Sequence, residues 1–547
     1  MRRGFIAFAA SCLTITALMA TSSSAAVVRY PGPAGAPLNT AYKVFVDGSP
    51  IDVYLANAEQ GDYSVAYFDF SDSVTVKIAS ITTAQIFPKS YGIVTRKVGD
   101  TLVFTLKQPR NIDIEAAGKN PLLLFANPLE VNPPKQGDAN VQYYGPGVQS
   151  GGINVGSNQT LYIAGGAFIQ GRISVSGSNI TIRGRGIIDG AGINIQNSNH
   201  VRVEGVICKG STGWTVTPRY SDSVTIHNVK VCNSRNLGDD AIDIVNCTNV
   251  LIKRCFLRCD DDNIAIKGYI HSTLETATWD KPCSSITIEE CAFWTDRANT
   301  FRIGFETEIQ GIEKNITARN CDVVHTFNGY TGINDYWANT VWYIQPTDNM
   351  AFENFLFEDI RIDNGKSILI KLIPMIRSGW GWNGVQVGKY VKNVTFRNIA
   401  WTGTAAPPIY ISGVDATHYV QDISLINVTV NGICTQRTSA GVTVGPNVTN
   451  LTFTCNASQT THPEAETTPA PSIIAVRQSA QGVHFDLPGA GEYAIRITNA
   501  GGQTVALESV RTNDGDALIC RMLPAGMYVA HVVAGSKRFA ARFVVAN

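Results

Sequence analysis

The stretch Asn236–Gly268 reads NLGDDAIDIVNCTNVLIKRCFLRCDDDNIAIKG and decides the fold. It holds two aspartate clusters, Asp239–Asp240 and Asp260–Asp262, and a short alternating apolar run follows each of them. Asp240 and Asp262 are separated by 22 positions (262 − 240), which is close to one turn of a right-handed parallel β-helix. Strands of adjacent turns stack about 4.8 Å apart. The stretch therefore predicts that the two clusters lie one above the other on successive coils.

An irregular repeat surrounds this stretch. Each unit has a polar turn ending in Asn, Asp, Ser or His, then a strand, a polar pair and a second strand. Variable spacing above a minimum of one coil indicates a solenoid with loop insertions. There is no LxxLxL run and no WD signature, so leucine-rich repeats and propellers lack support. The first-strand positions are Ile180, Val201, Val224, Val250, Ile286, Ile316, Phe355, Val394, Ile423 and Leu451.

The flanking segments indicate further β domains. Alternating runs such as VTVKIA and TLVFTLKQ, broken by Asp-Gly and Gly-Asp, predict a β-sandwich over residues 27–133, either a cap on the next domain or a carbohydrate-binding module. The β-helix is expected over 134–455 and a Thr/Pro/Ala/Glu-rich linker over 456–472. A second small sandwich over 473–547 resembles sorting or surface-attachment modules. The predicted fold class is all-β.

The N-terminus has the pattern of a secretory signal. Met1-Arg2-Arg3 precedes an apolar run from Gly4 to Ala20, and small residues support cleavage after Ala26. We therefore expect a secreted protein, extracellular, on the cell surface or in the periplasm. No later run is long and apolar enough to predict a membrane span.

Charge and cysteine content exclude several classes of partner. Basic and acidic residues balance at 44 each, so no field favours nucleic acid. No C-x-x-C pair or His/Cys cluster with zinc spacing occurs, and we predict no metal and no cofactor. Cys434 and Cys455, one coil apart, are predicted to form a disulfide, while Cys255, Cys291 and Cys321 should stack inside the helix. We expect a monomer.

Stacked aspartates favour acid–base chemistry. Carboxylates held close together repel one another when all are ionised, so the pKa of one of them should rise. A protonated carboxylic acid beside an ionised carboxylate is the pair of groups that glycosidases use in catalysis. The competing interpretation is that these aspartates are turn residues, which bond to their own backbone. Five aspartates in two groups at one-coil spacing favour the catalytic interpretation.

DDAIDI and DDDNIAIKG at this spacing resemble the motifs of the family 28 glycoside hydrolases, the polygalacturonases and their bacterial relatives. The resemblance implies a right-handed β-helix of the pectate-lyase-like superfamily and inverting hydrolysis. Asp261 would be the general acid. Asp240 and Asp262 would together hold and deprotonate the attacking water.

Two departures from the family pattern bear on the substrate. Asn299 stands where the family has a histidine, and no Arg-x-Lys pair lies between Asn315 and Asn349. Without those cations a uronate loses its recognition group, so a neutral or differently charged polysaccharide is expected. Arg302 and Glu306 are the local substitutes, unless they form a salt bridge with each other. The full predicted substrate-binding set is Asp239, Asp260, Lys267, Asn299, Arg302 and Glu306.

Two rival functions remain open. A polysaccharide lyase shares the β-helix, and Lys267 is the nearest candidate for its base. A non-catalytic carbohydrate-binding surface protein with a degenerate site would bind without turnover. Aromatic residues expected on exposed loops suit sugar rings in either case; these are Trp279, Trp294, Tyr330, Tyr336, Trp337, Trp342, Trp380 and Trp382.

Overall fold

The computed structural model describes residues 26–58, 61–233, 237–269, 281–327, 338–379 and 382–455, together with most of 475–545. The predicted signal and linker therefore lie outside the described residues. The elements are strands throughout, apart from one 3₁₀ turn, η1 (Lys89–Tyr91), and the all-β prediction is confirmed. In the part of the chain that is described, no helix has the length and apolarity needed to cross a membrane.

A β-sandwich precedes the solenoid, as predicted. Alternating inward-facing residues such as Val74, Val76 and Ile78 fill the core between its two sheets. The first sheet contains β1 (Val27–Arg29), β4 (Val53–Ala56), β5 (Tyr63–Phe70), β7 (Ala84–Phe87), β10 (Arg110–Ala116) and β11 (Leu122–Pro128). The second contains β2 (Lys43–Val46), β3 (Ser49–Ile51), β6 (Val74–Ala79), β8 (Thr95–Val98) and β9 (Thr101–Leu106).

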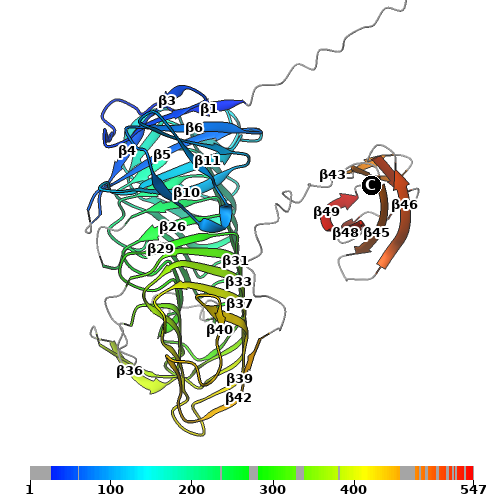
Figure 1. Cartoon of the computed structure of the whole chain (residues 1–547). Coiled ribbons are helices and arrows are strands. Elements are labelled where there is room, and N and C mark those ends of the chain that lie inside the picture. Colours follow the sequence, from blue (N-terminus) through cyan, green and yellow to red (C-terminus); the bar gives the residue numbers. More distant parts are fainter. Residues whose placement is uncertain are drawn as a thin grey trace, which may run out of the picture. The chain divides into compact units, whose positions relative to one another are not determined.

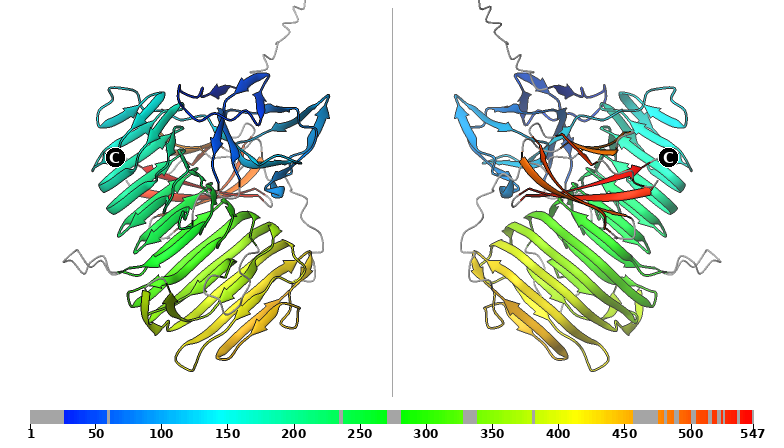
Figure 2. Two further views of the ribbon diagram at one scale, coloured as in Figure 1. Left: turned by 90° about the vertical axis from the view of Figure 1, so that its left-hand side faces the viewer. Right: turned by 90° about the vertical axis from the view of Figure 1, so that its right-hand side faces the viewer.

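The central domain is a right-handed parallel β-helix, drawn from cyan to orange in Figures 1 and 2. Its earlier strands are β12 (Val141–Tyr144), β13 (Gly147–Ser150), β14 (Ile153–Val155), β15 (Thr160–Ile163), β16 (Ala167–Gln170), β17 (Ile173–Gly184), β18 (Ile187–Asp189), β19 (Ile193–Glu204), β20 (Ile207–Lys209), β21 (Val216–Arg219), β22 (Asp222–His227), β23 (Lys230–Cys232), β24 (Ile242–Val245), β25 (Thr248–Lys253), β26 (Phe256–Cys259), β27 (Ile264–Gly268) and β28 (Ser284–Glu289). The later strands are β29 (Ala292–Thr295), β30 (Phe301–Thr307), β31 (Gly311–His325), β32 (Thr340–Gln345), β33 (Met350–Gly365), β34 (Ile368–Leu372), β37 (Tyr390–Gly403), β38 (Ile409–Ile411), β39 (Tyr419–Val430), β40 (Ile433–Cys434), β41 (Val442–Val444) and β42 (Val448–Thr454). A separate antiparallel pair joins β35 (Ile376–Gly379) to β36 (Trp382–Val387).

The predicted repeat register is confirmed along the whole helix. The ten first-strand positions pair in parallel, coil to coil, from Ile180↔Val201 to Ile423↔Leu451. Their apolar side chains stack in one continuous core. This burial explains why insertions between coils leave the register unchanged, since a slip by one residue would turn every core side chain outward.

The cysteine side chains also lie at the positions that the sequence predicts. Cys255, Cys291 and Cys321 are buried in the core of the helix. Cys434 and Cys455 form the predicted disulfide at its C-terminal end.

One column of strands matters for function. β14, β17, β19, β21, β24, β27, β30, β32, β34, β38 and β41 pair in succession, and we call them the aspartate column. The N-terminal sandwich packs against a different column, and side chains such as Tyr63 share an apolar core with Phe256 and Trp294. The Tyr63 hydroxyl donates to the Asn233 carbonyl oxygen (2.7 Å), in the segment before Asp239. The sandwich thus supports the site as well as covering the helix.

The C-terminal segment is a separate compact unit. Its strands form two antiparallel sheets, as the sequence predicted. One sheet has β43 (Ala475–Ser479), β44 (Gly482–Asp486) and β47 (Asp516–Ile519); the other has β45 (Gly491–Asn499), β46 (Thr504–Thr512), β48 (Gly526–Ala534) and β49 (Lys537–Val545).

Candidate active site

The two aspartate clusters lie on successive coils, as predicted from their spacing. Ile242 of β24 pairs with Ile264 of β27, which places Asp240 beside Asp262 at the start of the two strands. The backbone continues this alignment, because the Ala241 amide donates to the Asp262 carbonyl oxygen (2.9 Å).

Three carboxylates each use one oxygen to bind the scaffold. Asp262 Oδ1 accepts hydrogen bonds from the backbone N (3.0 Å) and Nδ2 (2.7 Å) of Asn299. Asp261 Oδ2 accepts from the Gly238 amide (2.7 Å), and Asp240 Oδ2 accepts from Lys267 Nζ (3.1 Å). Asp240 also shares a side-chain hydrogen bond with Asp243. Among the described residues, no hydrogen bond reaches the second oxygens of Asp261 and Asp262, which leaves these two atoms for a water or a sugar.

Electrostatics distinguish the three groups. Burial, followed by the charges of Asp240 and Asp262, raises the pKa of Asp261 well above its ordinary value. Burial and Asp240 raise the pKa of Asp262 to about 6, while Arg302, Lys267 and the Asn299 bond oppose that rise. Asp261 is also partly exposed, whereas Asp240 and Asp262 are buried. The arrangement places a protonated carboxyl at the surface beside carboxylates that can ionise.

Lys267 is the centre of a buried ion-pair network. Its Nζ lies 3.1 Å from Asp240 Oδ2, 2.8 Å from Asp243 Oδ1 and 2.6 Å from Glu306 Oε2. The same atom lies 3.5 Å from the centre of the Trp214 ring. Burial disfavours the charged amine, but the three carboxylates raise the pKa of Lys267 well above its ordinary value. Lys267 therefore stays protonated and holds Asp240 in place.

The strand that carries Arg302 and Glu306 is irregular between these two residues. Gly304 and Phe305 have φ values of 89° and 66°, and the register with β27 shifts at this point. The irregularity turns Glu306 toward Lys267, and its Oε1 accepts a hydrogen bond from the Tyr269 hydroxyl (2.5 Å). Together these contacts, against the effect of burial, lower the pKa of Glu306.

Arg302 lies over aromatic rings. Its guanidinium carbon is 3.9 Å from the Tyr343 ring centre and 4.7 Å from that of Phe305. The side chain is buried and its charge lowers the pKa of Asp262. Arg302 thus favours the ionised form of the predicted base.

Asp239 and Asp260 are placed differently from the prediction that they bind substrate. Both are fully buried. Asp239 Oδ1 accepts hydrogen bonds from the Asp260 (2.7 Å) and Asp261 (3.1 Å) amides, so it fixes the second cluster onto the first. Asp260 Oδ2 pairs with Arg297 (2.9 Å), while burial and Asp239 raise the pKa of Asp260 to about 7. Their geometry is that of positioning residues.

Several residues of the site were missed by sequence reasoning. Asp243 lies inside the quoted motif and faces outward by strand alternation, which could have identified it. Trp214 lies just before β21, one coil before Asp240, and nothing in the sequence around it pointed to the site. Trp294 and Trp342 are buried in apolar cores, which corrects their predicted place on exposed loops. Trp279, Tyr330, Tyr336, Trp337 and Trp380, and the side chain of Trp382, lie outside the described residues.

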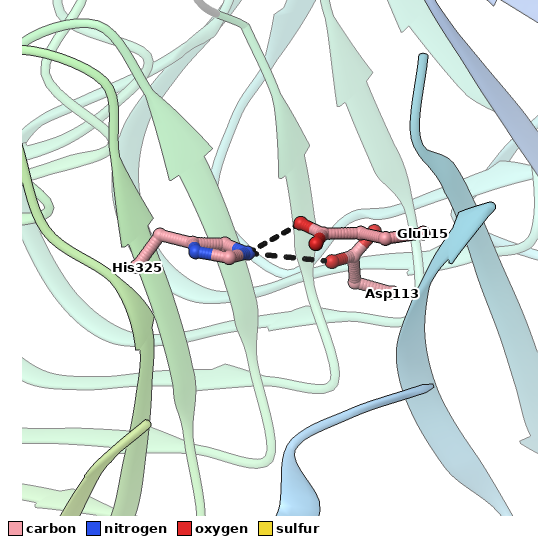
Figure 3. Close-up of side chains that lie close together, drawn as sticks. All are labelled: Asp113, Glu115 and His325. Carbon is pink, nitrogen blue, oxygen red and sulfur yellow. Dashed lines mark ion pairs between the residues drawn. The ribbon is translucent and has the colours of Figure 1, made fainter. Parts of the chain in front are cut away.

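One group in the described part of the chain is close enough to hold a metal ion, and it is remote from the aspartates in sequence (Figure 3). His325 of β31 faces two acids of the sandwich strand β10, with Nε2 lying 2.5 Å from Glu115 Oε1 and 3.7 Å from Asp113 Oδ2. The carboxylates raise the pKa of His325 to about 8, against the effect of burial. A proton on the imidazole therefore suffices to hold the group together.

Comparisons with known proteins agree with the fold. No protein-family model and no curated protein matched the chain. Among solved structures, Dex49A from Penicillium minioluteum matches with TM-score 0.52 and 13% identity, covering 78% of this chain and 96% of that one. The Yersinia enterocolitica family 28 exopolygalacturonase matches with TM-score 0.38 and 12% identity over 71% and 97%. A Thermotoga maritima exopolygalacturonase gives 0.33 and 17% over 57% and 83%. The match to Dex49A shows that this chain shares its fold.

Proposed function

We propose that this protein is a secreted glycoside hydrolase that cleaves O-glycosidic bonds of a polysaccharide with inversion at the anomeric carbon. One observation carries the proposal. Asp240, Asp261 and Asp262 meet on two stacked coils, and burial together with the charges of Asp240 and Asp262 raises the pKa of the partly exposed Asp261 well above its ordinary value. The broader assignment, a carbohydrate-active β-helix protein, agrees with the polysaccharide-degrading proteins that share the fold.

The proposed reaction uses each carboxyl once. Protonated Asp261 gives its proton to the glycosidic oxygen as the bond to the anomeric carbon breaks. Asp240 and Asp262 hold a water and take its proton as it attacks from the opposite face. Lys267 keeps Asp240 oriented, and Asn299 holds Asp262 and favours its ionised form.

The geometry of Lys267 favours hydrolysis over the lyase alternative. A lyase needs a neutral basic side chain to remove a proton from the sugar, or another group in that role. Lys267 is instead bound by three carboxylates, and its pKa is raised rather than lowered. It is therefore a poor base at neutral pH.

The test is release of reducing ends from polygalacturonate, rhamnogalacturonan, dextran, pullulan and arabinan by the native protein and by Asp261→Asn. A matched control is Asp222→Asn, since Asp222 lies on β22, outside the aspartate column. We expect one glycan to be cleaved by the native and control proteins, with a loss of about 10²–10⁴-fold in Asp261→Asn. Equal activity in Asp261→Asn would contradict the assignment of the acid, and equal glycan binding without any turnover would favour the surface-protein alternative.

Export and oligomeric state are part of the same proposal. Expression in a bacterium with an intact export pathway should yield a mature chain beginning after Ala26, as read by N-terminal sequencing. Light scattering should report a monomer.

A further inference from the structure

A polar pocket opens on the aspartate column, on the N-terminal side of the aspartates. It measures about 230 Å³ and includes Arg172, Asn194, Trp214, Thr217 and Arg219, which we call the arginine pocket. Asn194 and Thr217 lie in register on β19 and β21. Strand β21 pairs with β24, so the pocket begins one coil from Asp240 and two coils from Asp262.

The pocket is continuous with the candidate active site through Trp214. One contact of its ring is with Lys267 Nζ, 3.5 Å from the ring centre. The other is with Arg219, whose guanidinium carbon lies 4.8 Å from the ring centre. Arg219 and Lys267 also share a line of paired residues, because Arg219 pairs with Val245 and Val245 with Lys267. With coils about 4.8 Å apart, a glycan lying along the helix axis would cover both sites.

The arginines of this pocket differ from others on the helix in their partners. Arg254, Arg319 and Arg397 form ion pairs with glutamates of neighbouring coils. Neither Arg172 nor Arg219 forms an ion pair with any residue that the structure describes, and the buried Nε of Arg219 has no hydrogen-bond partner there. A buried guanidinium nitrogen without an acceptor is costly, so the pocket offers a hydrogen-bond donor that an oxyanion of a ligand could satisfy.

We propose that the arginine pocket binds an anionic sugar of the polysaccharide, through a carboxylate or a sulfate ester, next to the bond that the aspartates cleave. A guanidinium presents a planar fork of donors that matches either oxyanion. Trp214 contacts the Arg219 guanidinium and helps to position its fork, and Asn194 and Thr217 supply polar groups for hydroxyls. This deepens the proposed function and rests on it. The absence of an Arg-x-Lys pair on the C-terminal side of the aspartates suggested a substrate that is not a uronate. The arginine pocket instead places cations for an acidic substrate on the N-terminal side of the aspartates.

The experiment measures binding rather than turnover. Calorimetric titrations would use Asp261→Asn as the parent protein, with polygalacturonate and hyaluronan for the carboxylate arm and κ-carrageenan for the sulfate arm. Dextran and carboxyl-reduced polygalacturonate are the neutral controls. In the parent we expect binding to at least one acidic glycan, weakened by raising the salt concentration from 20 to 200 mM.

Adding Arg219→Gln should weaken that binding by about 10- to 100-fold. Arg219→Lys, which keeps the charge and loses the fork, should recover part of it. Arg397→Gln is the matched control and should change nothing. Thermal midpoints within error of the parent would show that each variant is folded.

The outcomes separate the two proposals. Arg219-dependent binding of an acidic glycan that the native protein fails to cleave would leave the pocket assignment standing and contradict the hydrolase. Asp261-dependent cleavage of a neutral glycan, unaffected by Arg219→Gln, would support the hydrolase and contradict the pocket assignment. The pocket assignment is also overturned if the parent binds none of the acidic glycans, or binds them equally with and without Arg219.

Discussion

Lys267 Nζ lies 2.6 Å from Glu306 Oε2, and this buried ion pair joins β27 to β30 directly beneath the predicted base Asp240. Lys267 is 2% exposed. One ammonium group among three carboxylates leaves a net negative charge, and burial with Asp240 raises the pKa of Asp243 so that Asp243 is the acid that stays protonated. Asp240 and Glu306 then face one ammonium group, so protonation of Asp243 reduces the net negative charge of the network without removing it.

Removal of this amine should destabilise the protein strongly. Lys267→Met removes the cation that pairs with Asp240 and Glu306 and leaves Glu306 with the Tyr269 hydroxyl as its partner; breaking a buried ion pair typically costs about 3–5 kcal/mol. The control is Lys253→Met, because Lys253 pairs with Glu289 and Glu290 at a partly exposed site and such pairs contribute about 0–1 kcal/mol. Guanidinium-induced unfolding of both variants measures the difference. Similar losses in the two would mean that the network contributes little.

The pH profile of hydrolysis should be bell-shaped. The pKa of Asp262 is raised to about 6, so the base carboxylate forms as pH rises through 6, and the rate should rise with it. The acid Asp261 must stay protonated, and burial with the charges of Asp240 and Asp262 raises its pKa well above its ordinary value, so the rate should fall again at the higher pH where Asp261 loses its proton. A profile of kcat/KM against pH measures both limbs. A rate that falls steadily from pH 4 would contradict these roles.

Asn299 offers a finer test of the same assignment. Its Nδ2 donates to Asp262 and favours the ionised form, so Asn299→Ala should raise the pKa of Asp262 by about one unit, which corresponds to about 1.4 kcal/mol. The acidic limb should then move to higher pH while the basic limb stays in place. Asn339→Ala, one coil further at another buried asparagine, is a control for the loss of a buried amide side chain away from Asp262. A uniform fall in rate with unchanged limbs would make Asn299 merely structural.

The register of the helix could be predicted because each coil repeats one apolar pattern. Val224, Val250 and Ile286 each follow a polar turn and each enter the core, so their alignment depends only on local sequence. The stacking of Asp240 on Asp262 followed from the same count. Coil insertions changed the spacing without changing this pattern.

Other features depend on contacts that no local pattern encodes. The direction of Glu306 follows from positive φ values at Gly304 and Phe305, and Phe305 is not a residue that usually adopts them. The Trp214 contact with Lys267 joins residues on different coils, and the packing of Tyr63 against the helix joins two domains. Contacts of this kind form only when distant parts of the chain meet in the fold, so the local sequence does not predict them.

The disulfide at the end of the helix should stabilise its last coils. Cys434 and Cys455 are 21 residues apart, and closing a loop of this size is worth about 3 kcal/mol in chain-entropy terms. Cys434→Ser should therefore lower the thermal midpoint, and a reductant should lower that of the native protein but not that of the variant. Cys291→Ser, which introduces a hydroxyl into the core, is the contrasting case, because its loss should be independent of reductant.

The contact between His325 and the sandwich should make stability depend on pH. The pKa of His325 is raised from 6.5 to about 8 in the folded protein. The ion pair with Glu115 therefore contributes fully below pH 6.5 and is lost as pH rises through 8. A shift of this size corresponds to about 2 kcal/mol. Burial raises the pKa of the facing Asp113 to about 6, so the titration of Asp113 overlaps the lower end of this window and the fall around pH 8 is the part that reports on His325.

Calorimetry from pH 6.5 to 9 tests this dependence. The thermal midpoint of the native protein should fall more steeply across the window than that of His325→Gln, because the variant has no imidazole proton to lose. His418→Gln is the matched control, since His418 pairs with Asp415 on the exposed surface and within one loop, and it should follow the native curve. Equal slopes for the native protein and His325→Gln would mean that the protonated imidazole does not hold the sandwich to the helix. Added zinc that stabilised the native protein at pH 8, but not His325→Gln, would instead show that a metal ion can replace the proton between the two acids.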